Sequence, residues 1–202
     1  MKNWIRNTLV LSLVCLGSAI GVGGTYLLTI PRIRARDAAR EKAALEAVLP
    51  GAKEVKPVQG AEGVFAGYDG TKLVGYAAVG AAQGYSSRLR VAVGARPLDD
   101  GSFEVLAIKV IHQQETPGLG ARVEEVKSDR TIFTVLFGGK KKANAPLAPW
   151  FQEQFRNKKE SEIKLKKSGG AIDAITGATI TSSAVVRAVQ DALARMKKAA
   201  KS

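Results

Sequence analysis

The sequence contains very little of the two residues that most often bind transition metals. Its 202 residues include one cysteine, Cys15, and one histidine, His112. A single cysteine cannot form an internal disulfide, and without a CxxC pair it cannot hold an iron–sulfur cluster or a cysteine-based zinc ion. A single histidine likewise excludes His-rich metal sites and haem with two histidine ligands within this chain. We therefore expect no metal site.

Acidic residues are also scarce. The chain has 18 Asp and Glu against 31 Lys and Arg, which gives a net charge of +13. Such a charge suits nucleic acid, an anionic membrane surface or an acidic partner. The sequence has no zinc spacing, no basic region before heptads and no RRM-type aromatic run, so we expect no nucleic-acid binding. Two interpretations stay open: lysines solvated on helix faces, and contact with a membrane or a neighbouring subunit.

Charge is absent from the segment between Thr8 and Ile30. Such a length can cross a hydrocarbon core of roughly 30 Å as a helix. Gly17 and Gly21 would allow close packing against other helices. We therefore predict a single transmembrane anchor within residues 1–31. The alternative is a signal peptide cleaved near Ala19, but the apolar character continues past that residue.

The charges that flank this segment bear on its orientation. Two basic residues precede it and five follow it, partly offset by Asp37 and Glu41. The two groups are Lys2 and Arg6, then Arg32, Arg34, Arg36, Arg40 and Lys42. A count of positive charges alone would place the rest of the chain in the cytoplasm.

The remainder indicates an α+β fold: a small twisted antiparallel sheet with flanking helices. We expect a membrane-proximal helix and linker over residues 32–55 and one domain over residues 56–202. The helix covers residues 36–48 and is ended by Pro50-Gly51. Asp69-Gly70 predicts a hairpin turn. The expected strands are residues 64–68, 72–79, 89–93 and 103–110.

The later part of the chain is less regular. Lys140, Lys141 and Lys142 are expected to be exposed. An aromatic segment, residues 150–155, predicts a short helix, and residues 162–166 one more strand. Residues 180–198 predict a closing helix with an apolar stripe at helical spacing. The stripe consists of Val185, Val186, Val189, Ala192, Leu193 and Met196.

The segment Asp173-Ala-Ile-Thr-Gly-Ala-Thr-Ile-Thr-Ser182 precedes this closing helix directly. A helix start has free N–H groups and the positive end of the helix dipole, which suit a phosphate. Gly177 would let the backbone approach a ligand closely. Four hydroxyl side chains can add hydrogen bonds: Thr176, Thr179, Thr181 and Ser182. The alternative is an ordinary helix cap, because Thr and Ser are common N-cap residues.

The pattern D-x-x-T-G-A-T-x-T-S resembles the flavinylation motif of the covalent FMN-binding domain family. The resemblance implies that FMN is joined through its phosphate to the hydroxyl of Thr179. It also places Asp173, Thr176, Gly177, Ala178, Thr181 and Ser182 in the cofactor site.

A second segment supports the same family. His112-Gln-Gln-Glu-Thr-Pro-Gly-Leu-Gly120 is similar to a flavin-pocket loop in the G subunits of Rnf electron-transport complexes. The resemblance adds five residues to the predicted site: His112, Glu115, Thr116, Gly118 and Leu119. Two weaker similarities are the Gly84-Tyr85 loop and the aromatic segment at 150–155. The C subunit of the sodium-translocating NADH:quinone oxidoreductase shares the flavin motif and is usually longer.

The resemblance implies a flavoprotein subunit that relays electrons inside an Rnf-type complex, which couples ferredoxin/NAD electron transfer to ion translocation. We expect no catalysis by the chain alone, contacts with other membrane and peripheral subunits, and a separate flavin transferase for maturation. The family places the flavin domain on the periplasmic side of the bacterial inner membrane. This placement disagrees with the charge count, and we follow the family because long domains can translocate despite flanking charges.

Two other functions stay open. A membrane-anchored FMN-binding regulator or sensor would carry the flavin without ion-translocating neighbours. A basic, non-redox binding module would hold an anionic partner and would be colourless.

Overall fold

The computed structural model describes residues 2–126 and 149–200. The predicted exposure of Lys140, Lys141 and Lys142 lies outside the described residues. The chain divides into two compact units, Met1–Arg40 and Glu41–Ser202.

The first unit consists of most of helix α1, Lys2–Ala47. Its apolar side chains are exposed from Leu9 to Leu28, and the helix is long and apolar enough to cross a membrane. The expected apolar helix is therefore confirmed. The helix expected over residues 36–48 forms too, as a continuation of α1 rather than as a separate element. Pro31 lies inside the helix, where its ring nitrogen cannot donate a hydrogen bond.

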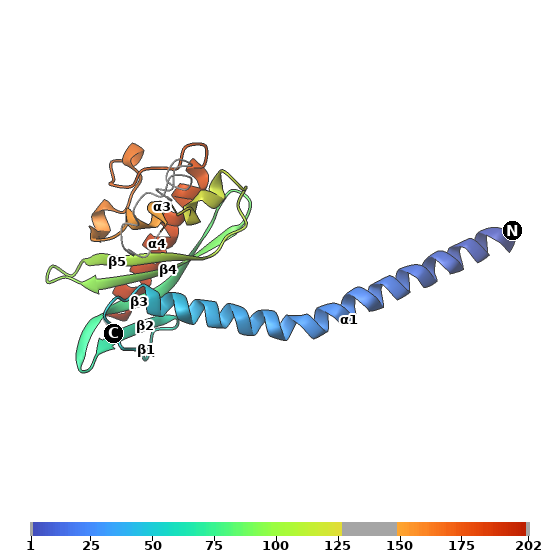
Figure 1. The fold of residues 1–202 in the computed structure, drawn as a ribbon, viewed down its shortest axis with the longest axis horizontal. Coiled ribbons are helices and arrows are strands. Elements are labelled where there is room, and N and C mark those ends of the chain that lie inside the picture. Colours follow the sequence, from blue (N-terminus) through green and yellow to red (C-terminus); the bar gives the residue numbers. More distant parts are fainter. Residues whose placement is uncertain (1, 127–148, 201–202) are drawn as a thin grey trace, which may run out of the picture. The chain divides into compact units, whose positions relative to one another are not determined.

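The second unit is built on a six-stranded sheet in which each strand pairs antiparallel with the next in the sequence. Figure 1 shows this sheet with helix α4, Thr179–Ala199, across one side. The expected α+β class is confirmed, as is the hairpin turn at Asp69-Gly70, where Gly70 has a φ of 65°. The strands are β1 Glu54–Pro57, β2 Val64–Asp69, β3 Lys72–Gln83, β4 Arg88–Pro97, β5 Phe103–His112 and β6 Lys158–Lys159.

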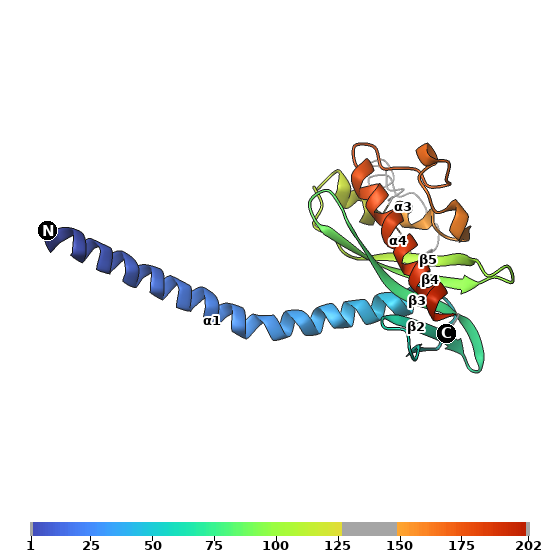
Figure 2. The ribbon, with the colours of Figure 1, turned by 180° about the vertical axis from the view of Figure 1, so that it is seen from behind.

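Within the described residues, a helical segment covers each face of the sheet. Side chains alternate along a strand, so Ala78 faces α4 and Ala77 faces residues 44–49 at the end of α1. Glycine allows close contact on both faces. A Cβ on Gly80 would lie 1.8 Å from the backbone oxygen of Ala188 in α4. A Cβ on Gly94 would lie 1.9 Å from the backbone oxygen of Val48. Figure 2 shows α4 lying along the sheet from the other side.

The segment that follows the aromatic helix differs from the prediction. The helix itself, α3 Trp150–Glu153, is confirmed. The strand expected over residues 162–166 is wrong: the stretch begins at the end of the 3-10 turn η2 Glu160–Glu162 and ends at the start of η3 Lys166–Ser168, and within it only Leu165 forms a β-bridge, with Ile172. Ile163 and Leu165 are buried with a period of two, as in a strand, but the chain reverses at Gly169-Gly170. A Cβ on Gly170 would lie 2.1 Å from the backbone oxygen of Lys164, so the segment folds back on itself.

Candidate functional site

Among the described residues, no side chain caps the start of α4. Ala178 is the N-cap residue, and none of the described side chains bonds to the free N–H groups of the first turn. Within the described residues, the backbone N–H groups of Thr179, Ile180 and Thr181 have no acceptor. The hydroxyl of Ser182 instead donates to the oxygen of Ala178 at 2.9 Å. The helix-cap interpretation of these hydroxyls is therefore wrong, and the positive end of the helix is left for a ligand.

Two tight turns face each other beside this helix start. In one, the N–H of Ala178 donates to the oxygen of Ile175 at 2.9 Å. In the other, the N–H of Leu119 donates to the oxygen of Thr116 at 3.2 Å. The third residue of each turn is a glycine with positive φ, 78° at Gly177 and 75° at Gly118, which a type II turn requires. A Cβ on Gly177 would lie 3.0 Å from Cδ2 of Leu119, so the turns are in close contact.

Glu115 connects three segments that are far apart in the sequence. Its Oε2 accepts hydrogen bonds from the hydroxyl of Thr181 at 2.6 Å and from the N–H of Tyr85 at 3.2 Å. Its Oε1 accepts from the N–H of Ser86 at 3.1 Å and from the N–H and hydroxyl of Ser87 at 3.0 and 3.2 Å. We call these five residues the Glu115 cluster: Tyr85, Ser86, Ser87, Glu115 and Thr181.

The environment of Glu115 favours its ionised form. Only 6% of the residue is exposed, and burial by itself raises the pKa of the carboxyl group. The Thr181 hydroxyl and the N–H groups of Ser87, Ser86 and Tyr85 act in the opposite direction and prevail, so the pKa is lowered from its ordinary value. The described residues include no cation paired with this carboxylate.

Small residues make room for the cluster. A Cβ on Gly84 would lie 2.6 Å from Oε1 of Glu115. A Cβ on Gly120 would lie 2.7 Å from the hydroxyl oxygen of Thr181 and 2.8 Å from Cβ of Glu115. Both positions are thus restricted to glycine by packing, because no larger residue fits without displacing the carboxylate.

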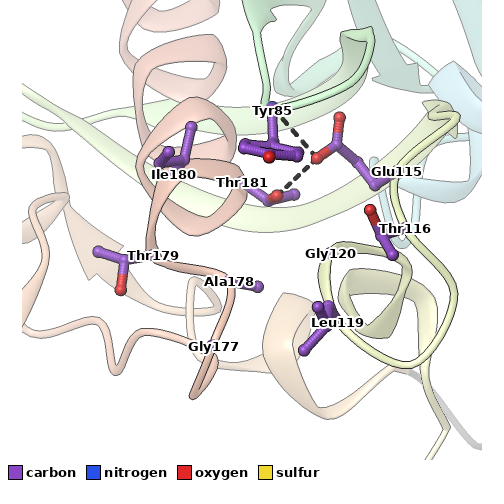
Figure 3. Close-up of a pocket in the computed structure, with 10 residues that line it drawn as sticks. All are labelled: Tyr85, Glu115, Thr116, Leu119, Gly120, Gly177, Ala178, Thr179, Ile180 and Thr181. Atoms are coloured by element: carbon purple, nitrogen blue, oxygen red, sulfur yellow. Dashed lines mark hydrogen bonds between the residues drawn. The ribbon is translucent and has the colours of Figure 1, made fainter.

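A pocket of about 580 Å³ opens between the two turns, the hairpin tip and the helix start. Figure 3 shows the residues that line it, with Thr179 on the opposite side of the helix start from Glu115. The volume is within the range of about 300–1,000 Å³ that is usual for cofactor sites. The lining consists of Tyr85, Glu115, Thr116, Leu119, Gly120, Gly177, Ala178, Thr179, Ile180 and Thr181.

The structure brings both predicted segments to this pocket. Seven predicted residues line it: Thr179, Gly177, Ala178, Thr181, Glu115, Thr116 and Leu119. The other predicted residues lie close by in the sequence but outside the lining. Asp173 forms an exposed ion pair with Lys166 at 2.7 Å. Ser182 is fully buried, Thr176 and Gly118 lie in the two turns, and His112 is exposed at the end of β5.

Three lining residues were not among the predicted site residues. Tyr85 lies at the tip of the β3–β4 hairpin, and the Gly84-Tyr85 loop gave only a weak sequence signal. Gly120 is the last residue of the loop that begins at His112, and its role depends on contacts with Thr181 and Glu115. Ile180 is an exposed apolar residue in the first turn of α4, a position at which the sequence gives no reason to expect a ligand.

Comparison with known proteins agrees with this geometry. Residues 84–194 match the FMN-binding domain. The G subunit of the ion-translocating oxidoreductase complex of Pseudomonas aeruginosa is 33% identical over 211 residues, with 95% of this chain and 88% of the relative covered. The G subunit of the proton-translocating ferredoxin:NAD(+) oxidoreductase complex of Clostridium ljungdahlii is 26% identical, with coverages of 91% and 86%.

Among solved structures, the crystal structure of Shewanella oneidensis NqrC matches with a TM-score of 0.45 and 17% identity, over 75% of this chain and 73% of that chain. The match to the FMN-binding domain begins at the hairpin tip and extends through both turns into α4, so it contains the whole lining of the pocket. The chain belongs to the FMN-binding domain family, together with the G subunits of ion-translocating oxidoreductase complexes.

Proposed function

We propose that this chain is a membrane-anchored flavoprotein subunit that carries FMN on Thr179 through a phosphoester bond. Its role is to relay electrons within an ion-translocating oxidoreductase complex of the Rnf type. The membership of the FMN-binding domain family supports the cofactor, and the relatives named as G subunits support the complex. The position of the bond is our inference from the residues of the site, and the side of the membrane is our inference from the family resemblance.

The pocket fits FMN in both charge and shape. The three N–H groups without acceptors at the start of α4 suit a phosphate dianion, and they lie beside the hydroxyl of Thr179. Leu119, Ile180 and the ring of Tyr85 offer apolar surface to a flat ring system. FMN, when bound, supplies the redox chemistry, and the protein supplies its position and electrostatic environment.

One observation carries the choice of Thr179. Thr181 and Ser182 are buried, 2% and 0% exposed, and their hydroxyls are hydrogen-bonded. The side chain of Thr179 is half-buried, lines the pocket and has no hydrogen-bond partner within the described residues. Among the four hydroxyl residues that the sequence singles out, only Thr179 combines a free hydroxyl with a place in the pocket.

Attachment requires an enzyme and an activated donor. With FAD as donor, the hydroxyl oxygen of Thr179 forms a bond to the phosphorus of the FMN half, the pyrophosphate bond breaks, AMP leaves and the hydroxyl proton is released. The described residues place no histidine or lysine in the pocket that could take this proton. We therefore assign the step to a separate flavin transferase. The covalent bond would then prevent loss of the cofactor by dissociation.

Helix α1 would anchor the domain in the bacterial inner membrane as a single span. We place the flavin domain on the periplasmic side, as the resemblance implies, even though five basic residues follow the apolar segment. Because no free FMN pool is expected outside the cytoplasm, a covalent cofactor is most useful on that side. A cysteine-labelling assay at an introduced surface cysteine near Lys72 would test this side in intact cells.

The proposal is tested by expressing the full chain with an active flavin transferase and examining its band on a denaturing gel for flavin fluorescence. Thr179→Ala should be dark, whereas Thr71→Ala, which removes an exposed hydroxyl in the turn between β2 and β3 and outside the pocket, should fluoresce like the wild type. A fluorescent Thr179→Ala band would move the bond to another residue. A dark wild-type band would favour the basic, non-redox binding module instead.

A further inference from the structure

We infer that Glu115 is a positioning residue that places a fixed negative charge beside the flavin and thereby lowers its reduction potential. This inference rests on the proposed function, because it assumes that FMN occupies the pocket that Glu115 lines. It concerns a side chain whose carboxylate is already saturated by protein donors. Glu115 therefore acts on the cofactor through its charge and through the hairpin that it holds, not as a direct hydrogen-bond ligand.

The hydrogen bonds support an ionised group. Three backbone N–H groups, which can only donate, point at the carboxylate from Tyr85, Ser86 and Ser87. The Ser87 hydroxyl also donates to the carboxylate while it accepts from the N–H of Gln114 at 2.8 Å. A protonated carboxyl group could donate only to a hydroxyl oxygen of the cluster, and it would accept less strongly from the three N–H groups. The ionised form satisfies all five contacts at once.

The charge is not neutralised locally. Within the described residues, no lysine or arginine forms an ion pair with Glu115, although eight other Asp and Glu residues each have one. The residue is buried, 6% exposed, so water screens it weakly. At an effective dielectric constant of about 20, a unit charge about 10 Å away changes an electron-transfer equilibrium by more than tenfold. The charge of Glu115 therefore makes it less favourable to add an electron to a flavin bound beside it, which lowers the reduction potential of the flavin.

The cluster also fixes the position of Tyr85. The hairpin tip is held to the carboxylate by consecutive N–H groups, and the carboxylate is held to α4 by Thr181. Figure 3 shows dashed lines from Tyr85 and from Thr181 that meet at the Glu115 carboxylate, above the turn that contains Leu119. Loss of Glu115 would free one wall of the pocket from the helix start.

The test is a spectroelectrochemical titration of the full, flavin-loaded chain. Glu115→Gln should raise the midpoint potential by an amount equal to about a tenfold change in the equilibrium, which is about 59 mV for one electron. Glu153→Gln is the matched control, because it removes one carboxylate from an exposed pair with Arg156 outside the pocket. Its potential should stay at the wild-type value. A loaded Glu115→Gln protein with an unchanged potential would overturn the inference.

A second variant separates charge from loosening of the pocket. Thr181→Val removes one donor but keeps the carboxylate charge, which is then less well compensated. Its potential should be equal to or lower than that of the wild type. If the potential of Thr181→Val rises, the geometry of the pocket and not the charge of Glu115 sets the potential, and the inference fails. This test holds even where Glu115→Gln does not load flavin. A wild-type chain without covalent flavin would instead contradict the proposed function itself.

Discussion

Thr179 and Thr181 lie two positions apart in the first turn of α4, but their hydroxyls have different surroundings. The hydroxyl of Thr181 is buried and donates to Glu115 at 2.6 Å. The hydroxyl of Thr179 has no hydrogen-bond partner within the described residues and borders the pocket. Residues two apart on a helix point to different sides. One hydroxyl is therefore held in the packed interior, while the other borders the pocket.

This difference predicts opposite effects on stability. Thr179→Ala should change the free energy of unfolding by less than about 0.5 kcal/mol, because it removes no hydrogen bond. Thr181→Val should lower it by about 1–3 kcal/mol, because it leaves a buried carboxylate oxygen with one donor fewer. Denaturant unfolding of the full chain in detergent, followed by circular dichroism, measures both. Equal values for the two variants would contradict the assigned roles.

The pH dependence of stability should contain a contribution from Glu115. The pKa of its carboxyl group is lower in the folded protein than its ordinary value of 4.5, so the folded state binds this proton less readily than the unfolded state. The stabilisation is therefore present above about pH 4.5 and is lost as the pH falls through the folded-state pKa. Unfolding free energies measured from pH 7 to pH 3 should fall less steeply for Glu115→Gln than for the wild type.

Asp100 provides a comparison for this measurement. The Ser102 hydroxyl and N–H also lower the pKa of the Asp100 carboxyl group, but this group is fully exposed. Water screens such a surface contact, so Asp100→Asn should leave the pH dependence close to that of the wild type. If Asp100→Asn changed the pH dependence of the free energy of unfolding more than Glu115→Gln does, burial would not determine how much a carboxylate contributes to that dependence.

Gly80 and Gly94 allow separate tests of the two faces of the sheet. A methyl group at Gly80 would collide with the backbone of α4, and one at Gly94 with the backbone at Val48. In each alanine variant the free energy of unfolding should fall by about 1–3 kcal/mol, which is the usual cost of overpacking. Gly80→Ala should also reduce covalent flavin, because it displaces the helix that carries Thr179. Gly94→Ala protein that remains folded should load flavin normally, as judged by gel fluorescence relative to protein amount.

The compact unit predicts where the chain can be shortened. A chain that starts at Glu41 should remain folded and soluble without detergent, because Glu41–Ser202 is a compact unit. A chain that starts at Ala52 should have a free energy of unfolding roughly 5 kcal/mol lower than that of the chain starting at Glu41, since Leu45, Val48 and Leu49 no longer cover the sheet. Solubility and thermal unfolding distinguish the two fragments. Equal stability would show that residues 44–49 do not contribute to the core.

Much of the fold could be predicted from local patterns. The apolar run in α1, the Asp69-Gly70 turn and the stripe on α4 each depend on residues close together in the sequence, and each is confirmed. The strand expected over residues 162–166 was wrong because the chain reverses at Gly169-Gly170, so that within this stretch only Leu165 forms a β-bridge, with Ile172. Strands β1 and β6 were missed because both are short and exposed.

The resemblance of two short motifs to a known family was enough to single out the two segments that line the pocket, whereas residue types alone left an ordinary helix cap as an alternative. Residue types were enough for the apolar anchor, since a long uncharged run needs no tertiary context. Which hydroxyl is free depends instead on tertiary packing, which brings Glu115 to within 2.6 Å of Thr181 across 66 positions of the chain. Such a contact follows from how the sheet and α4 pack, and no local pattern encodes that packing.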